Sequence, residues 1–375
     1  MRRRALSPRP DWPRRCEEVG FAFHSEHGPY WDESAAYEFD AAQVDRLEAV
    51  TEELHRLALD ALAWVVDRGD FEAFGFAPAA VEEIVRSWRR GDPSLYGRFD
   101  FSWDGIGEPK LLEYNADTPT ALLESSVVQW YWLRDVFPER DQFNSLHEKL
   151  VERWRSLRDD WPLEMAVHFA AMRDSREDQG NAAYLLDTAV QAGLQAAATC
   201  IEDIGFDPSR ASFVDLDDRP ITHCFKLYPW EWMFRDEFAL HLSAGSTLFL
   251  EPPWKVLLSS KAMLPILSAL NPGHPNLLPA SMQPDIPAPY VRKPRFSREG
   301  SNVRLVGVAG SPGTDGPYGD EPCIYQAAAP LPRFGARHAM VGSWVVGERA
   351  AGLCVREDDS PITRDTSRFV PHYFV

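Results

Sequence analysis

The amino-acid sequence contains no apolar run that approaches the roughly 20 residues a helix needs to cross a bilayer. Its longest apolar stretches, such as residues 61–66, are far shorter. The opening MRRR is followed by Pro8, Pro10 and Pro13, where a secretion signal would need an apolar segment. These absences lead us to expect a cytoplasmic protein with no membrane partner.

Cysteine is scarce, and its spacing shows no pairing. The five cysteines are an odd number, and none of them forms a CxxC motif. The ten histidines likewise show no HExxH motif. Such a set is typical of reduced thiols in a reducing compartment, so the sequence predicts neither a disulfide framework nor a zinc site.

Positive charge is in deficit, with 39 Lys and Arg against 57 Asp and Glu and a net charge of -18. A chain with this charge repels nucleic acids unless basic residues gather locally. We therefore expect small-molecule ligands and no nucleic-acid partner. Any anionic ligand must be bound by a local cluster of Lys and Arg. Nothing in the sequence indicates the oligomeric state.

Three common nucleotide-binding and catalytic motifs are also absent. The sequence contains no GxxxxGK[ST], no GxGxxG and no GxSxG. Their absence excludes a P-loop, a Rossmann dinucleotide site and the nucleophile elbow of α/β-hydrolases. The hydrophobic share of 45% is nevertheless ordinary for a chain that buries a full core.

Apolar periodicity predicts helices first and a hairpin after them. Residues 39–67 and 79–90 carry apolar side chains at helical spacing. The pattern then changes to alternation over residues 95–103 and 110–115, with turn residues between the two segments. The sequence therefore predicts a β-hairpin that follows two helices.

The rest of the chain predicts a mixed α/β (α+β) organisation. Helices are expected over residues 120–132 and 143–155. A helix over residues 182–192 and two strands, over 164–170 and 211–214, belong to a βαβ-like section between 161 and 220. Strands of a later sheet are predicted over residues 246–250, 290–293, 303–308, 323–326, 339–346 and 349–356.

Polar side chains on the hairpin form a candidate Mg²⁺ site. Side chains alternate between the two faces of a strand, so Arg98 and Asp100 share one face, as do Glu113 and Asn115 on the second strand. Carboxylate and amide oxygens are ligands that Mg²⁺ prefers when substrate phosphates complete its shell, and an Arg suits a transferring phosphoryl group. The alternative is a surface hairpin with ordinary cross-strand ion pairs.

The same alternation assigns the apolar side chains of the hairpin. Phe99, Phe101, Leu112 and Tyr114 are predicted to lie on the core side, and Leu111 on the side of Glu113. An apolar face of this kind is expected to pack against a core.

The segment directly after Asn115 carries two hydroxyl groups. Thr118 and Thr120 stand at the start of a predicted helix, whose free N–H groups suit an anion or a substrate carboxylate. The alternative is that one of these threonines only caps the helix, and the two functions are compatible.

A basic cluster lies in the second half of the chain. Lys255, Lys261 and Lys293 stand in apolar or proline-marked sequence, and several arginines accompany Lys293. In a chain of negative net charge, such a cluster favours a bound polyanion, and the lysines suit nucleotide phosphates. The alternative is a solvated basic loop.

Five ordered segments resemble the glutathionylspermidine synthetase family, and specifically its short branch of acid–amine ligases without the cysteine amidohydrolase domain. The segments are residues 96–101, 111–120, 259–265, 293–302 and 352–357. The resemblance runs from about residue 13 to the C-terminus. It implies an ATP-grasp-type fold with reversed motif order, in which antiparallel sheets are flanked by helices and a smaller βα lobe is added.

The resemblance also implies a division of the chain into three regions. Residues 1–160 would form an N-terminal helical region with the Mg²⁺-binding hairpin. Residues 161–240 would form the small βα lobe, and residues 241–375 the ATP-grasp nucleotide-binding region.

Roles for individual residues follow from the same resemblance. The Mg²⁺ ligands would be Asp100, Glu113 and Asn115. Catalytic arginines facing the transferring phosphate and the acyl phosphate would be Arg98, Arg298 and Arg356. Residues at ATP would be Lys261, Lys293 and Gln326, the last in the segment near adenine. Substrate-binding residues would be Thr118, Thr120 and Glu231.

The function implied is an ATP- and Mg²⁺-dependent ligase that forms an amide between a carboxylate and an amine through an acyl phosphate. Its partners would be a small acid, such as a peptide or amino acid, and a small amine. The base for the amine is either Glu231 or Asp117. The alternatives are a nucleotide-binding homologue without catalysis and a kinase of a small carboxylate.

Two positions depart from the synthetase pattern. Leu227 stands where the synthetase has a substrate-contacting threonine, and Thr363-Arg364 stands where it has consecutive lysines. A buried polar group of the ligand left without a partner costs about 1–3 kcal/mol. We therefore expect glutathione to be a poor substrate.

Overall fold

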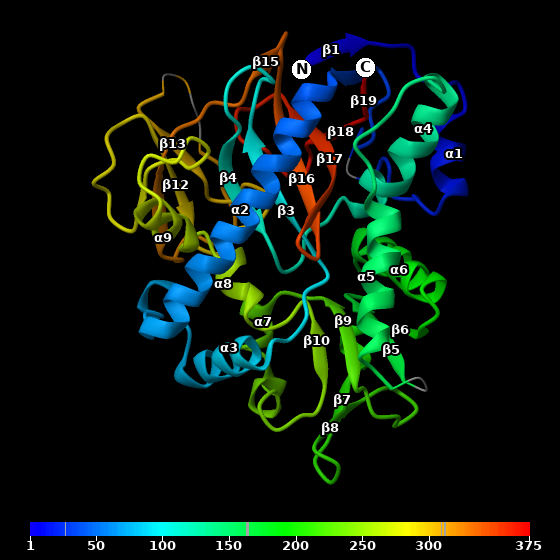
Figure 1. Ribbon diagram of the computed structural model, residues 1–375, viewed down its shortest axis with the longest axis vertical. Coiled ribbons are helices and arrows are strands. Elements are labelled where there is room, and N and C mark those ends of the chain that lie inside the picture. Colours follow the sequence, from blue (N-terminus) through cyan, green and yellow to red (C-terminus); the bar gives the residue numbers. More distant parts are fainter. Residues whose placement is uncertain (27, 163–164, 309, 311–312) are drawn as a thin grey trace.

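The computed structural model describes residues 1–26, 28–162, 165–308, 310 and 313–375. Antiparallel sheets make up one part of the molecule, and a parallel sheet forms a lobe at its other end (Figure 1). Among the described residues, no helix is both long enough and apolar enough to span a membrane.

The main antiparallel sheet carries the predicted hairpin at one edge. Its strand order is β18-β17-β16-β3-β4, and β15 (Arg333–Phe334) pairs with β16. The bounds are Arg368–Val370 for β18, Arg349–Asp358 for β17, Arg337–Val346 for β16, Tyr96–Ser102 for β3 and Lys110–Asn115 for β4. The predicted strands over 95–103, 110–115, 339–346 and 349–356 are confirmed.

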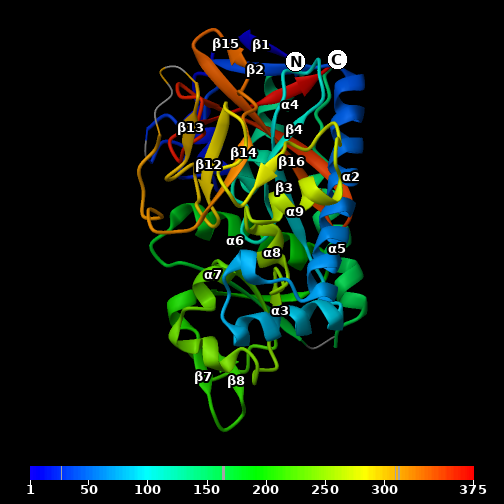
Figure 2. The ribbon, with the colours of Figure 1, turned by 90° about the vertical axis from the view of Figure 1, so that its left-hand side faces the viewer.

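Helix α2 (Ala41–Arg68) packs against this sheet, as the 39–67 periodicity predicts. It begins at a capping box, in which the Asp40 side chain accepts from the backbone N–H of Gln43 and the Gln43 side chain accepts from the backbone N–H of Asp40. It ends at Gly69, whose φ of 68° closes the last turn. Figure 2 shows α2 along one side of the antiparallel part and β12 and β13 toward the other side.

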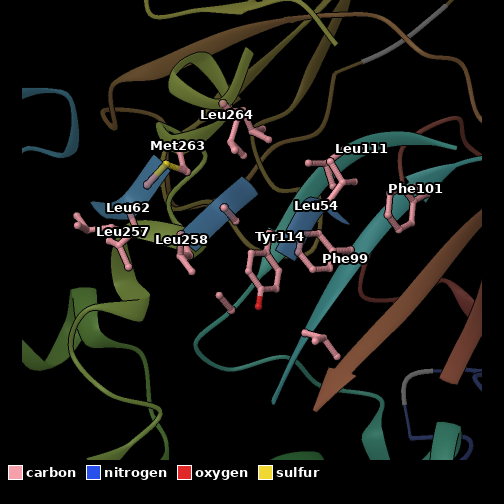
Figure 3. Close-up of a cluster of buried hydrophobic side chains, with 14 of the residues drawn as sticks. Leu54, Leu62, Phe99, Phe101, Leu111, Tyr114, Leu257, Leu258, Met263 and Leu264 are labelled. Atoms are coloured by element: carbon pink, nitrogen blue, oxygen red, sulfur yellow. The ribbon is translucent and has the colours of Figure 1, made fainter. Parts of the chain in front are cut away.

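The core beneath the hairpin is built from aromatic and aliphatic side chains (Figure 3). The rings of Phe99 and Tyr114 stack with centroids 3.8 Å apart, and Leu54 of α2 belongs to the same cluster. Because Tyr114 is fully enclosed, its hydroxyl needs a partner, and it lies 3.1 Å from Nδ1 of His55. The core side of the hairpin is thus fixed by α2.

The prediction for Leu111 and Leu112 is wrong, because a β-bulge reverses them. Asp100 pairs with Glu113 and Phe101 with Leu111, so Leu112 is the extra residue on β4. Leu111 is 1% exposed in the core, whereas Leu112 lines the pocket described below. A bulge shifts the alternation by one residue, and strict period two cannot anticipate it.

A second antiparallel sheet has the order β11-β14-β12-β13. The bounds are Ala280–Ser281 for β11, Cys323–Ala327 for β14, Tyr290–Pro294 for β12 and Arg304–Val306 for β13. Helices α8 (Lys255–Ser259) and α9 (Met263–Leu270) precede it along the chain. The predicted strands 290–293, 303–308 and 323–326 correspond to β12, β13 and β14.

The parallel lobe has the strand order β10-β9-β5-β6. The bounds are Leu248–Leu250 for β10, His223–Leu227 for β9, Ala166–Ala171 for β5 and Gln195–Cys200 for β6. Helix α6 (Arg176–Gln191) connects β5 to β6, and it begins six residues before the predicted helix over 182–192. The lobe supplies the βα unit that the sequence predicts: the predicted strand over 164–170 corresponds to β5, although residue 164 lies outside the described residues. The strand predicted over 246–250 as part of a later sheet is β10, which belongs to this parallel lobe instead.

The second strand of that unit is not the one predicted. Residues 212–214 form β8 (Ser212–Val214), which pairs antiparallel with β7 (Gly205–Asp207) outside the parallel sheet. Strand β5 pairs in parallel with β6, which follows α6 along the chain, and with β9 on its other side. The sequence of β6, QAAATC, is rich in alanine and poor in β-branched residues, so propensity gives little sign of a strand there.

The remaining elements join the two ends of the chain. Strand β2 (Ala35–Phe39) pairs with β1 (Arg2–Ala5) and β19 (His372–Phe374).

The other helices are α1 (Trp12–Glu18), α3 (Pro78–Arg90), α4 (Gln129–Val136), α5 (Leu146–Asp159) and α7 (Trp230–Met233). A π-helical turn, Glu124–Val128, precedes α4, where one continuous helix over 120–132 is expected. Short 3₁₀ turns lie at Glu72–Phe74, Ile201–Asp203 and Glu237–His241.

Candidate active site

A pocket of about 220 Å³ is lined by residues from both antiparallel sheets. Most of the residues predicted to form the site lie on its wall. They are Arg98, Asp100, Glu113, Asn115, Thr118, Thr120, Lys261, Lys293, Arg298 and Arg356. Two other predicted residues, Glu231 and Gln326, lie behind this wall and contact residues that line it.

The register of β3 and β4 brings the predicted Mg²⁺ ligands face to face. Arg98 lies opposite Asn115, and Asp100 lies opposite Glu113. Arg98 donates to both oxygens of Asp100, with Nε 2.7 Å from Oδ1 and Nη2 3.0 Å from Oδ2. Asn115 Nδ2 donates to Oδ2 of Asp100 at 2.9 Å. Burial raises the pKa of Asp100, and Arg98 opposes that rise.

Two lysines face the hairpin from the second half of the chain. Lys261 Nζ lies 3.0 Å from Oε2 of Glu113 and donates to the carbonyl of Ser297 at 2.6 Å. Lys293 Nζ donates to the carbonyl of Leu112 at 3.0 Å and to Oε1 of Gln326 at 2.8 Å. Gln326 is 2% exposed, and its side-chain oxygen accepts the hydrogen bond that holds Lys293 in place.

These charges perturb one another. Burial raises the pKa of Glu113, but the positive charges of Lys261 and Lys293 outweigh burial and lower it to about 2. Burial is also the largest effect on Lys293, and it lowers the pKa of this lysine to about 8 although Glu113 acts in the opposite direction. Glu113 is therefore ionised at neutral pH, and Lys293 has a pKa about one pH unit above neutrality.

The donor set fits a magnesium ion shared with phosphate. Across the described residues, no cluster of three or more His, Cys, Asp or Glu side chains is arranged to hold a metal alone. The pocket instead offers the carboxylates of Asp100 and Glu113 and the amide of Asn115. Mg²⁺ is commonly bound by one or two carboxylates together with substrate phosphates, which is the arrangement this set suits.

Arg298 connects the predicted substrate residues. Its Nη1 donates to Oγ1 of Thr118 at 2.8 Å, and its Nη2 donates to Oε1 of Glu231 at 2.9 Å. Glu231 is only 3% exposed. In the part of the chain that the structure describes, Oε2 of Glu231 is buried without a hydrogen-bond partner. Glu231 thus reaches the pocket wall through Arg298 and keeps one carboxylate oxygen that could accept a further hydrogen bond.

Arg356 reaches the pocket from β17. Its Nη2 donates to the carbonyls of Arg364 at 2.9 Å and Ser367 at 3.2 Å, so the loop before β18 holds it. Thr363 of the same loop also lines the pocket. Three backbone carbonyls of this loop, those of Arg364, Asp365 and Ser367, thus hold the guanidinium of Arg356 at the pocket wall.

Three expectations are corrected here. Asp117 is 0% exposed and forms an ion pair with Lys226, so it is enclosed and unsuited to act as the base for the amine. Lys255 is likewise enclosed, paired with Glu251, and does not line the pocket. Leu227 packs in the core of the parallel lobe, which removes the basis for expecting that it weakens glutathione binding.

The apolar wall of the pocket is the part that residue patterns miss. It consists of Leu112, Val291, Val303, Leu305, Val308, Leu331 and Met340. One signal was present: Val291 and Lys293 are two residues apart on β12, so a lysine at the pocket predicts that Val291 shares its face. Leu305 and Met340 lie on β13 and β16, whereas the remaining members lie in loops or at the bulge of β4, where a sequence does not reveal the side-chain directions.

Comparison with known proteins gives a consistent family. Residues 3–375 match the family described as "Glutathionylspermidine synthase preATP-grasp". A Haemophilus influenzae protein named "Putative acid–amine ligase" is 43% identical, with 98% of each chain covered. Trypanothione synthetase from Crithidia fasciculata is 29% identical over 89% of this chain, which spans only 55% of that relative.

A solved structure supports the fold. A glutathione synthetase-like effector from Globodera pallida, in its apo form, superposes with a TM-score of 0.58 at 13% identity. The superposition covers 99% of this chain and 100% of the effector. The expected mixed α/β fold of the ATP-grasp type, with antiparallel and parallel sheets flanked by helices, is confirmed.

Proposed function

Because this chain belongs to the glutathionylspermidine synthase preATP-grasp family, we propose that it uses ATP and Mg²⁺ to join a carboxylate to an amine. The observation that carries the proposal is the convergence of Asp100, Glu113, Lys261 and Lys293 on one pocket wall. Carboxylates for a metal and lysines for phosphates are the parts that phosphoryl transfer requires.

In the first step, an oxygen of the acid substrate attacks the γ-phosphorus of ATP. The bond from that phosphorus to the β–γ bridging oxygen breaks, ADP leaves, and an acyl phosphate forms. Lys261 and Lys293 would hold the phosphates, and Arg98 would offset charge on the transferring group. Asp100, Glu113 and Asn115 would hold Mg²⁺, which, when bound, neutralises phosphate charge.

In the second step, the amine nitrogen attacks the acyl carbon and inorganic phosphate leaves. Arg298 and Arg356 would stabilise the negative charge around that carbon, because both guanidinium groups line the pocket. Thr118 and Thr120 would bind the acid. Glu231, which has an unpartnered buried oxygen among the described residues, would accept the proton that the amine loses.

Trapping with hydroxylamine tests the first step without knowledge of the amine. The protein is incubated with Mg²⁺, ATP, a panel of amino acids and short peptides, and hydroxylamine. An acyl phosphate is converted to a hydroxamate, which mass spectrometry identifies. We expect a hydroxamate with at least one acid. ADP release with no hydroxamate from any acid would contradict the proposal.

A further inference from the structure

The turn after Asn115 is anchored to the parallel lobe by a buried ion pair. Lys226 of β9 places its Nζ 2.7 Å from Oδ1 of Asp117, and the two side chains are 1% and 0% exposed. The backbone N–H of Trp230, at the start of α7, donates to Oδ2 of Asp117 at 2.8 Å. Both oxygens of this carboxylate are therefore engaged by the lobe.

A hydroxyl on α8 holds the same turn from another side. Oγ of Ser259 accepts from the backbone N–H groups of Ala116, at 3.0 Å, and Asp117, at 2.7 Å. The turn is thus fixed by β9, α7 and α8, which are more than 100 residues away along the chain.

The same turn binds two arginines of the pocket. Oγ1 of Thr118 accepts from Arg298 at 2.8 Å, and the carbonyl of Thr120 accepts from Nη1 of Arg98 at 2.6 Å. A continuous series of contacts therefore runs from Lys226 through Asp117 to both guanidinium groups. A displacement of the turn would move the two arginines together.

Stability alone does not account for this ion pair. Removing two charges from water is costly, and apolar residues of similar volume are often equally or more stabilising. Asp117 is nevertheless enclosed with hydrogen bonds to both oxygens. Hydrogen bonds are directional, whereas apolar contacts are not. Bonds to both oxygens of Asp117 therefore specify one position for the backbone of this turn.

We propose that Lys226 and Asp117 are positioning residues, which set the places of Arg98 and Arg298 by fixing the turn between residues 116 and 120. The inference rests on the proposed function, because the two arginines are the groups assigned to the transferring phosphate and the acyl group. Neither Lys226 nor Asp117 lines the pocket. Both act through the turn.

A second buried ion pair provides a matched control. Lys255 and Glu251 are both 0% exposed, with Nζ 3.0 Å from Oε2. Glu251 accepts from the backbone N–H groups of Leu95 and Tyr96, so this pair fixes the start of β3. In the described residues this pair makes no hydrogen bond of its own to residues 116–120. Its connection to the turn is indirect, because Lys255 is on the same helix as Ser259 and the hydroxyl of Tyr96 donates to the carbonyl of Pro119.

The experiment compares Lys226→Met with Lys255→Met, each of which leaves a buried carboxylate without its partner. Both variants are expected to lower the thermal unfolding temperature. Hydrogen–deuterium exchange is then followed in peptides covering residues 113–123, at a temperature where both variants are folded. We expect a large increase in exchange at residues 116 and 117 in Lys226→Met and a smaller increase in Lys255→Met, because the second pair reaches the turn only indirectly through Ser259 and Tyr96.

Kinetics gives the second readout. A displaced pocket group can cost about a hundredfold in rate, so Lys226→Met should lower kcat/KM for the acid by about that factor. Affinity for a non-hydrolysable ATP analogue with Mg²⁺ should stay within about threefold of wild type, because Lys261 and Lys293 do not contact the turn through any bond in the described residues.

Two further variants separate positioning from stability. The double variant Asp117→Asn, Lys226→Met removes both charges, so its unfolding temperature should rise above that of Lys226→Met while kcat/KM stays low. Recovery of kcat/KM together with stability would overturn the proposal. Ser259→Ala loosens the turn without leaving an unpaired charge, and it should repeat the exchange and kcat/KM results even if Lys226→Met does not fold.

The exchange measurement needs no substrate, so it separates this proposal from the proposed function. A larger increase in exchange in Lys226→Met than in Lys255→Met supports the positioning of the turn even if the wild-type protein forms no amide. Equal exchange in the two lysine variants, or wild-type kcat/KM in Lys226→Met, overturns the positioning even if the wild-type protein is a ligase.

Discussion

Lys261 and Glu113 form an ion pair on the pocket wall, with Nζ 3.0 Å from Oε2. The carboxylate of Glu113 also faces Asp100 across the hairpin. Glu113 therefore lies between Lys261, whose charge suits a phosphate, and Asp100, whose carboxylate suits a cation. A magnesium–phosphate complex has this same division of charge, so it can be bound without leaving either partner uncompensated.

Replacing Glu113 by Gln tests this relationship. The change keeps the side-chain volume but removes the charge that would hold the metal, so Mg²⁺-dependent ADP formation should fall by about a hundredfold or more. Glu108→Gln is the matched control, since Glu108 belongs to the loop of the same hairpin and lies outside the pocket. Wild-type turnover in Glu113→Gln would remove Glu113 from the metal site.

Lys293→Ala and Arg356→Ala should affect different steps. Loss of a charge-assisted hydrogen bond costs about 1.5–3 kcal/mol, so Lys293→Ala should weaken nucleotide binding by about ten- to a hundredfold. Arg356→Ala should leave nucleotide affinity near wild type and lower kcat. Calorimetric titration with the nucleotide, together with steady-state kinetics, measures both. Equal loss of nucleotide affinity in the two variants would show that their roles are confused.

Nucleotide affinity should decrease as the pH rises through about 8. Burial lowers the pKa of Lys293 to about this value, and the neutral amine cannot offset phosphate charge. Lys293→Arg keeps its charge at these pH values, so its affinity should lack this step. Dissociation constants measured between pH 7 and 9 check the prediction. A step of equal size in Lys293→Arg would assign it to another group.

Lys293 should affect the stability of the protein with the opposite pH dependence to its effect on nucleotide affinity. Its pKa is lower in the folded protein than its ordinary value of 10.5, so the unfolded chain binds more protons between about pH 8 and 10.5. The contribution of Lys293 to the free energy of unfolding therefore rises with pH across this window. Comparing the pH dependence of unfolding in wild type and Lys293→Met isolates it, and a difference that falls with pH would contradict the assignment.

Gly342 on β16 gives a prediction about packing next to the hairpin. A Cβ at this position would lie 2.5 Å from Sγ of Cys354, 3.1 Å from Cδ of Arg98 and 3.4 Å from Oδ1 of Asp100. Gly342→Ala should therefore destabilise the protein by about 1–3 kcal/mol and reduce activity. Adding Cys354→Ala makes room for the methyl group and should restore much of both. Wild-type stability and activity in Gly342→Ala would show that residue 342 and Cys354 are not closely packed.

The sequence predicts the hairpin and its polar face well, because alternation is a property of each strand by itself. Asp100 and Glu113 could be paired from their spacing around one turn. The bulge at Leu112 could not, since it depends on how β4 accommodates the core beneath it. Strand β6 was missed for a related reason: its alanines become a strand only because β5 is beside it.

The contacts behind the pocket lie beyond the reach of local patterns. Asp117 and Lys226 are 109 residues apart, and nothing in either segment marks the other as its partner. Glu231 is named from the family resemblance, but the sequence does not show that it and the nearby Lys226 have different partners: Lys226 binds the turn, and Glu231 binds Arg298. Only the tertiary fold separates these two functions.

The most direct test of the account is a mass-spectrometric screen of acid and amine pairs with ATP and Mg²⁺, including glutathione with spermidine. We expect an amide product with at least one pair, with one ADP and one phosphate released for each amide, and loss of that product in Glu113→Gln. An acyl phosphate or phosphorylated acid without any amide would identify a kinase. That result, or amide formation that continues without ATP, would contradict the proposed ligase.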